Sequence, residues 1–70
     1  QARELFKQAI QIFERLGSRL EQGKALYYFG QAQMAWGEIQ PGQESIGSAL
    51  QIFQACKANY WVAKARELTA

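Results

Sequence analysis

The residues that could perform chemistry are few and scattered in this 70-residue chain. It has no histidine, a single cysteine at Cys56 and six carboxylates that do not cluster along the sequence. General acid–base catalysis needs titratable groups that converge and shift each other's pKa values. A metal site needs a ligand set that this composition does not offer. We therefore predict no enzymatic activity, no catalytic residues, no metal site and no cofactor.

The charged and glycine residues have ordinary structural explanations. Several carboxylates have a lysine or arginine nearby or lie towards the N-terminus of a predicted helix, where negative charge is favourable. These are Glu4, Glu14, Glu21 and Glu44. The glycines match no phosphate-binding loop motif, and helix ends and close packing account for them.

Composition narrows the classes of protein and partner. With 49% hydrophobic and 20% charged residues, the chain has enough apolar surface to fold. The net charge is +2 and the basic residues are dispersed, so we expect no nucleic-acid partner. The longest uncharged stretch, Ala25 to Gly37, is shorter than the ~20 apolar residues of a membrane span. One cysteine fits a reducing compartment, and we expect a cytoplasmic protein.

Apolar residues recur at spacings of three and four along the whole chain, which predicts amphipathic helices and no strands. The expected helices cover residues 2–16, 20–36, 41–57 and 59–70, with Gly17 and Gly37 at helix ends and Asn59 as a cap. The stripes that should face the core are Ala2, Leu5, Phe6, Ala9, Ile10, Phe13 and Leu16; Ala25, Leu26, Phe29, Ala32, Gln33 and Trp36; Ile46, Ala49, Leu50, Phe53 and Cys56; and Trp61, Val62, Ala65 and Leu68.

The chain repeats itself after forty residues, as the segments AIQIF and ALQIF show. The identical pairs are Glu4 and Glu44, Ala9 and Ala49, Gln11 and Gln51, Ile12 and Ile52, Phe13 and Phe53, Lys24 and Lys64, and Ala25 and Ala65. Small residues also coincide, Ala2 with Gly42 and Gly30 with Ala70, which indicates close helix approaches in register. Four helices could form a closed bundle or two stacked hairpins, and the repeat favours stacked hairpins. Cys56 takes the place of Leu16 and is expected to be a buried small hydrophobe.

These residues resemble a tetratricopeptide repeat (TPR), a stack of antiparallel helical hairpins. Leu26, Phe29 and Gly30 stand at the marker positions of the family's first helix, and the GEI segment at residues 37–39 is similar to its turn. The markers of the second helix correspond to Gly42, Ile46 and Ala49, and one repeat earlier to Ala2, Phe6 and Ala9. The period is forty residues, where thirty-four is usual in the family. With this longer period the chain resembles the sensor regions of bacterial regulatory ATPases and transcriptional activators.

The resemblance implies an all-α solenoid fragment, a single domain of residues 1–70. Residues 1–17 would be the second helix of one repeat, residues 20–57 a full repeat and residues 59–70 the first helix of the next. The chain begins inside a helical pattern without a methionine, and we expect it to belong to a longer protein.

Function is expected on the side of the first helix that lines the concave groove in the resembled family. Lys24, Tyr27, Gln31 and Met34 step by three and four and would form a continuous ladder there, with Tyr28 beside it. The predicted partner-binding residues are Lys24, Tyr27, Gln31, Met34, Lys64 and Glu67. A basic groove would take a protein or peptide with acidic residues. Alternatively, Tyr27 and Met34 pack against the neighbouring hairpin.

A second class of function stays open, in which the chain is a structural module that self-associates. The end helices of a repeat stack need polar outer faces, and an isolated piece lacks them. Trp61, beside Tyr60, would either cover a neighbouring helix or face another subunit of a homo-oligomer.

Overall fold

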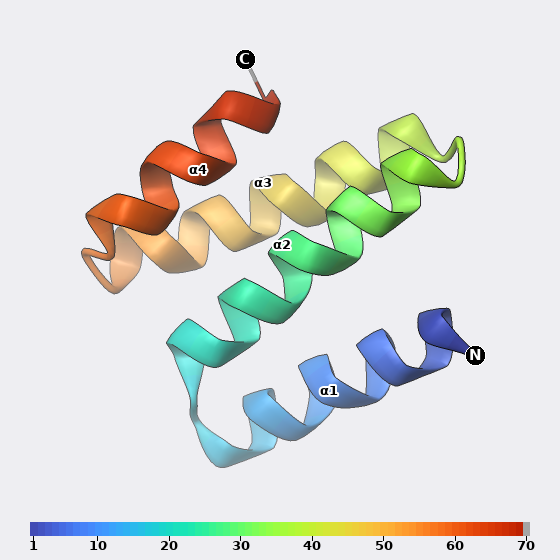
Figure 1. The fold of residues 1–70 in the computed structure, drawn as a ribbon. Coiled ribbons are helices and arrows are strands. Elements are labelled where there is room, and N and C mark those ends of the chain that lie inside the picture. The colour runs from blue at the N-terminus through green and yellow to red at the C-terminus, as the bar shows by residue number, and fades with distance from the viewer. Residues whose placement is uncertain (70) are drawn as a thin grey trace.

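The computed structural model describes residues 1–69, and these form four α-helices without a strand (Figure 1). The helices are α1 (Ala2–Leu16), α2 (Arg19–Ala35), α3 (Ile39–Ala55) and α4 (Asn59–Thr69). The predicted all-α fold with four helices is confirmed. Ala70, the expected counterpart of Gly30, lies outside the described residues.

The helix ends follow from a few residues with special backbone geometry. Gly17 and Gly37 have φ values of 71° and 88°, the left-handed region that glycine enters without steric cost. Helix α3 begins at Ile39, so Pro41 lies in its first turn, where its missing N–H leaves no bond unmade. Helix α4 begins at Asn59 itself. The capping role predicted for Asn59 is therefore wrong, because Ala58 occupies the position before the helix.

The helices pack in the order in which they follow one another along the chain. Helices α2 and α3 make the most extensive contact, α1 packs on α2, and α4 packs on α3. Helices α1 and α4 consequently lie at opposite ends of the molecule (Figure 1). The arrangement is flattened, with principal extents of 30 × 28 × 14 Å.

The core lies between α2, α3 and α4. Ile46, Ala49, Phe53 and Ala65 have no exposed surface, and Tyr27 joins them. Trp61, Val62 and Leu68 of α4 pack against this group, as their spacing predicted. The inward faces expected for α3 and α4 are confirmed at these positions.

Helices α2 and α3 approach until their backbones touch at Gly30 and Gly42. A Cβ atom on Gly30 would lie 2.8 Å from the Gly42 carbonyl oxygen and 2.7 Å from Cδ1 of Ile46. A Cβ atom on Gly42 would lie 2.8 Å from the Gly30 carbonyl oxygen. Neither helix could come as close with any larger residue at these positions, as the coincidence of small residues in the repeat indicated.

One polar pair lies inside this interface. Gln33 is 7% exposed, and its Oε1 atom accepts a hydrogen bond of 2.6 Å from the Ser45 hydroxyl. A buried amide without a partner is costly, so this bond favours the packing of α2 and α3 that places Ser45 opposite Gln33.

Several residues predicted to be buried are exposed. Leu5 and Leu16 of α1 are 64% and 69% exposed, because α1 has its extensive contact with α2 alone and no residue of α1 is fully buried. Trp36 is 43% exposed at the C-terminal end of α2. Cys56, expected to be a buried hydrophobe, is exposed because it stands just after the last residue of α3.

Helix α1 is held by an aromatic contact and an ion pair. Phe6 stacks on Phe29 with ring centres 5.5 Å apart. The Arg3 guanidinium donates two hydrogen bonds, of 2.6 and 3.1 Å, to the Glu38 carboxylate and lies 4.8 Å from the Trp36 ring centre. The hydrogen bond from Arg3 lowers the pKa of Glu38. Partial desolvation opposes this shift, and the charges of Arg3 and Lys7 lower the pKa further by smaller amounts.

Replacing Gly30 by alanine should destabilise the protein by ~1–3 kcal/mol, because the added methyl meets the Gly42 backbone and Ile46. Gly47 is the matched control within α3: a Cβ atom there meets nothing within 4 Å. Gly47→Ala should therefore stabilise the helix by ~0.5–1 kcal/mol. Chemical denaturation of both variants checks this, and equal effects at the two positions would contradict the close approach.

Replacing Glu38 by glutamine should loosen α1 at neutral pH and have no effect in acid. The folded-state pKa of Glu38 lies below its ordinary value of 4.5, so the pair stabilises fully above that value. The stabilisation is lost as the pH falls through the lowered pKa. Thermal midpoints of parent and Glu38→Gln should differ most at neutral pH and converge as the pH falls through the lowered pKa. A difference that is constant over this range would contradict the ion pair.

Candidate functional site

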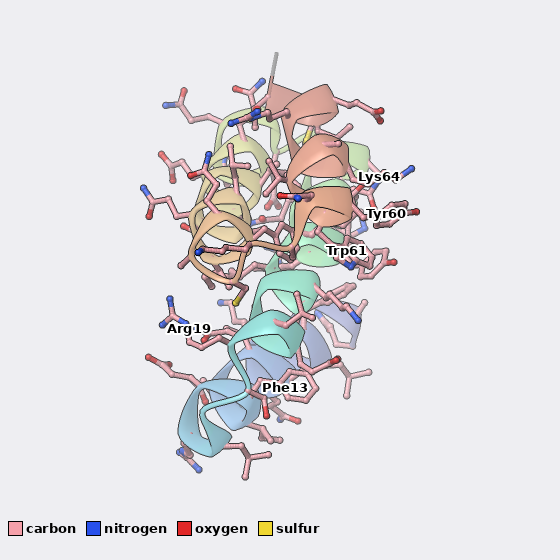
Figure 2. All side chains as sticks on the ribbon, turned by 90° about the vertical axis from the view of Figure 1, so that its left-hand side faces the viewer. Phe13, Arg19, Tyr60, Trp61 and Lys64 are labelled. Atoms are coloured by element: carbon pink, nitrogen blue, oxygen red, sulfur yellow. The ribbon has the colours of Figure 1, made fainter. Side chains whose placement is uncertain are left out.

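Helices α2 and α4 bring a group of aromatic and basic side chains together on one side of the molecule. We call Lys24, Tyr28, Tyr60, Trp61 and Lys64 the aromatic face. The ring centre of Trp61 lies 5.3 Å from that of Tyr60 and 6.2 Å from that of Tyr28, both in edge-to-face geometry. Tyr28 and Tyr60 are 48% and 65% exposed, so a partner can reach both rings. Figure 2 shows Tyr60, Trp61 and Lys64 of α4 on the same side of the molecule.

Trp61 lies between the exposed rings and the core. Its ring centre lies 5.6 Å from that of Phe53 and 5.7 Å from that of the buried Tyr27. Trp61 is itself half-buried and packs against the core. Of the two alternatives for Trp61, the structure supports the one in which it covers neighbouring helices.

The two lysines lie over rings of the same aromatic group. The ammonium of Lys24 is 5.4 Å from the Trp61 ring centre, and that of Lys64 is 5.9 Å from the Tyr60 ring centre. Such cation–π contacts contribute ~0.5–1 kcal/mol at exposed sites and hold the long side chains in one place. Lys24 also has Glu21 at 3.5 Å, which offsets part of its charge.

The predicted site residues divide into two groups. Lys24 of α2 and Lys64 of α4 each lie over a ring of the aromatic face. Gln31 of α2 and Glu67 of α4 are exposed. Tyr27 is 5% exposed and belongs to the core, so its placement in an open ladder is wrong. Met34 is half-buried and packs against the core beside Gly42, so its predicted place in the open ladder is wrong as well.

The error for Tyr27 is one of helical phase. Gly23, Tyr27 and Gly30 share the face of α2 that turns towards α3, and all three are buried. Lys24, Tyr28 and Gln31 lie one position further on and turn outward. The small residues at positions 23 and 30 mark the buried face, and they could have identified Tyr28, not Tyr27, as the exposed ring.

The described residues offer little for other kinds of site. Within residues 1–69, no group of three or more Cys, Asp or Glu residues is placed to hold a metal ion. No helix in this range combines the length and apolar character needed to cross a bilayer. The aromatic face is thus a surface of flat rings and two cations, which suits carboxylates and apolar side chains.

No protein-family model, curated protein or solved structure matched the chain.

Substitutions of the neighbouring residues Tyr60 and Trp61 should distinguish an exposed ring from a ring that supports the fold. Tyr60→Ala should change the free energy of unfolding by less than ~0.5 kcal/mol, because its ring is largely exposed. Trp61→Ala should cost about 3 kcal/mol, since it removes contacts with Phe53 and Tyr27. Denaturant titrations measure both. Similar costs at the two positions would contradict the division between exposed and supporting rings.

Proposed function

We propose that this chain is a TPR-like helical-repeat module that binds an acidic peptide segment of a partner protein on the aromatic face. The observation that carries the proposal is the meeting of Lys24 and Lys64 at one aromatic group. Two equivalent positions of a repeated sequence thereby supply the same charge to the same surface.

The packing order of the helices supports the repeat interpretation. Helix α2 follows α1 as α4 follows α3, and each helix packs mainly on its neighbours in the chain. Helices stacked in this way present equivalent side chains at regular intervals, and an extended peptide can contact them in turn.

The recognition chemistry follows from the two kinds of side chain. The lysine ammonium groups attract carboxylates over several ångströms, which speeds association more than it strengthens the complex. The exposed rings of Tyr28 and Tyr60 offer flat apolar surface with a hydroxyl at the edge, a combination enriched among residues that dominate binding energy. A peptide with acidic residues beside an apolar or aromatic one fits both requirements.

A second candidate function is that of a structural oligomerisation module. It is favoured by the large apolar side chains that α1 exposes, namely Leu5, Ile12 and Leu16. This surface is separate from the aromatic face, so the two functions can be tested with different variants.

The peptide-binding function is tested with synthetic peptides rich in Asp and Glu and with matched peptides carrying Asn and Gln. Changing both Lys24 and Lys64 to alanine should slow association about tenfold at low salt and flatten its salt dependence. Tyr28→Ala should instead speed dissociation. Glu21→Gln should accelerate association, because it removes the carboxylate 3.5 Å from Lys24. Stopped-flow fluorescence over a salt series measures these rates.

The matched control changes two exposed basic residues of α1, Lys7 and Arg15, to alanine. This variant has the same net charge as the double lysine variant but keeps the aromatic face, so it should bind nearly as the parent does. If both double variants lost binding equally, or if neither did, the aromatic face would not be the site and the oligomerisation function would take first place.

A further inference from the structure

Helix α1 carries an open apolar hollow that is lined by residues of α1 alone. The hollow measures about 360 Å³ and is lined by Ala2, Leu5, Phe6 and Ala9. Leu5 is 64% exposed. None of these residues belongs to the aromatic face, so a role for the hollow is independent of peptide binding on that face.

The four lining residues have equivalents in the repeat, and those equivalents are covered by another helix. A shift of forty residues places the four lining residues on Gly42, Ser45, Ile46 and Ala49 of α3. All four lie at the contact of α3 with α2 or in the core beside it. Gly42 and Ile46 pack on Gly30, Ser45 donates its hydrogen bond to Gln33, and Ala49 has no exposed surface.

We propose that the hollow on α1 is a docking site for one amphipathic α-helix, which packs on the side of α1 that corresponds to the α2-facing side of α3. The α2–α3 contact is the template for this interaction, because it shows what the equivalent side chains of the repeat accept. A helix that docks there needs a glycine where α2 has Gly30, since a Cβ atom at that point of the template meets the Gly42 carbonyl oxygen and Ile46.

Three of the four lining positions differ between α1 and α3. Phe6, which also stacks on Phe29 of α2, replaces Ile46. The other two differences define how the docking helix must differ from α2. Leu5 replaces Ser45, the hydrogen-bond donor to Gln33, so the helix must present an apolar residue in place of Gln33. Ala2 replaces Gly42, and a Cβ atom at that position would lie 2.8 Å from the Gly30 carbonyl oxygen and would also collide with the Met34 side chain. The docking helix must lie further from α1 than α2 lies from α3, because the carbonyl oxygen belongs to the backbone. The helix must also have a residue smaller than methionine where α2 has Met34.

A second copy of this chain is a poorer occupant. Its α2 is already enclosed between α1 and α3. Its α4, the helix equivalent to α2, carries Arg66 and Glu67 where α2 has Leu26 and Tyr27. Charged side chains at these positions would lose water against the apolar hollow without gaining a partner.

The probes are two synthetic peptides of residues 18–37, one with the native sequence and one with Gln33→Leu and Met34→Ala. The parent protein should bind the changed peptide about tenfold more tightly than the native one. Leu5→Ser should reverse or abolish this preference, because serine can donate a hydrogen bond to the glutamine of the native peptide. The control is Leu16→Ser, the same change at an exposed leucine of α1 outside the hollow, which should leave the preference intact.

Fluorescence anisotropy gives the affinities, and amide chemical shifts locate the peptide. Shifts confined to α1 and the facing side of α2 support the proposal. The proposal is overturned if neither peptide binds, if the preference survives Leu5→Ser, or if the shifts lie in α3, which would mean that the peptide displaces α2. It is also overturned if sedimentation of the protein alone shows a dimer that Leu5→Ser abolishes, because a second copy would then be the occupant.

Discussion

The structure depends on the backbone contact between α2 and α3 at Gly30 and Gly42. Two helices that meet without intervening side chains are fixed in their relative position, because neither can slide without a carbonyl oxygen striking the other helix. This contact buries Tyr27 and Gln33 on one side of α2 and turns Lys24 and Tyr28 outward. The position of α4 depends on this contact too. Trp61 of α4 packs against the rings of Phe53 and Tyr27, which the contact holds in place.

The two ends of the molecule differ in character. Helix α4 covers the core with Trp61, Val62 and Leu68 and exposes polar residues such as Arg66 and Glu67. Helix α1 rests on α2 through Phe6 and a solvated ion pair, and it leaves Leu5 and Leu16 uncovered. Helix α1 therefore has more uncovered aliphatic surface than α4 has.

Charge has a smaller part in the fold than packing does. The Arg3–Glu38 pair joins α1 to the residue before α3, yet both side chains are 36% exposed, and pairs of this kind contribute little to stability. The lysines of the aromatic face are likewise held by rings and not by buried carboxylates. The carboxylate nearest to Lys24, that of Glu21 at 3.5 Å, is exposed as well.

The order of residues along the chain was enough to predict the number and type of helices, the core faces of α3 and α4, and the coincidence of small residues at a close crossing. These properties depend on local periodicity and on the repeat, and both are visible in the linear sequence. The open face of α2 was not predictable in this way: a step of one residue separates Tyr27 from Tyr28, and only the docking of α3 and α4 buries the first and exposes the second. Nor could the sequence show that Leu5, Leu16 and Cys56 are exposed, because an apolar stripe shows only that a helix face is able to pack. Whether a neighbour is present to cover that stripe is decided by the tertiary arrangement.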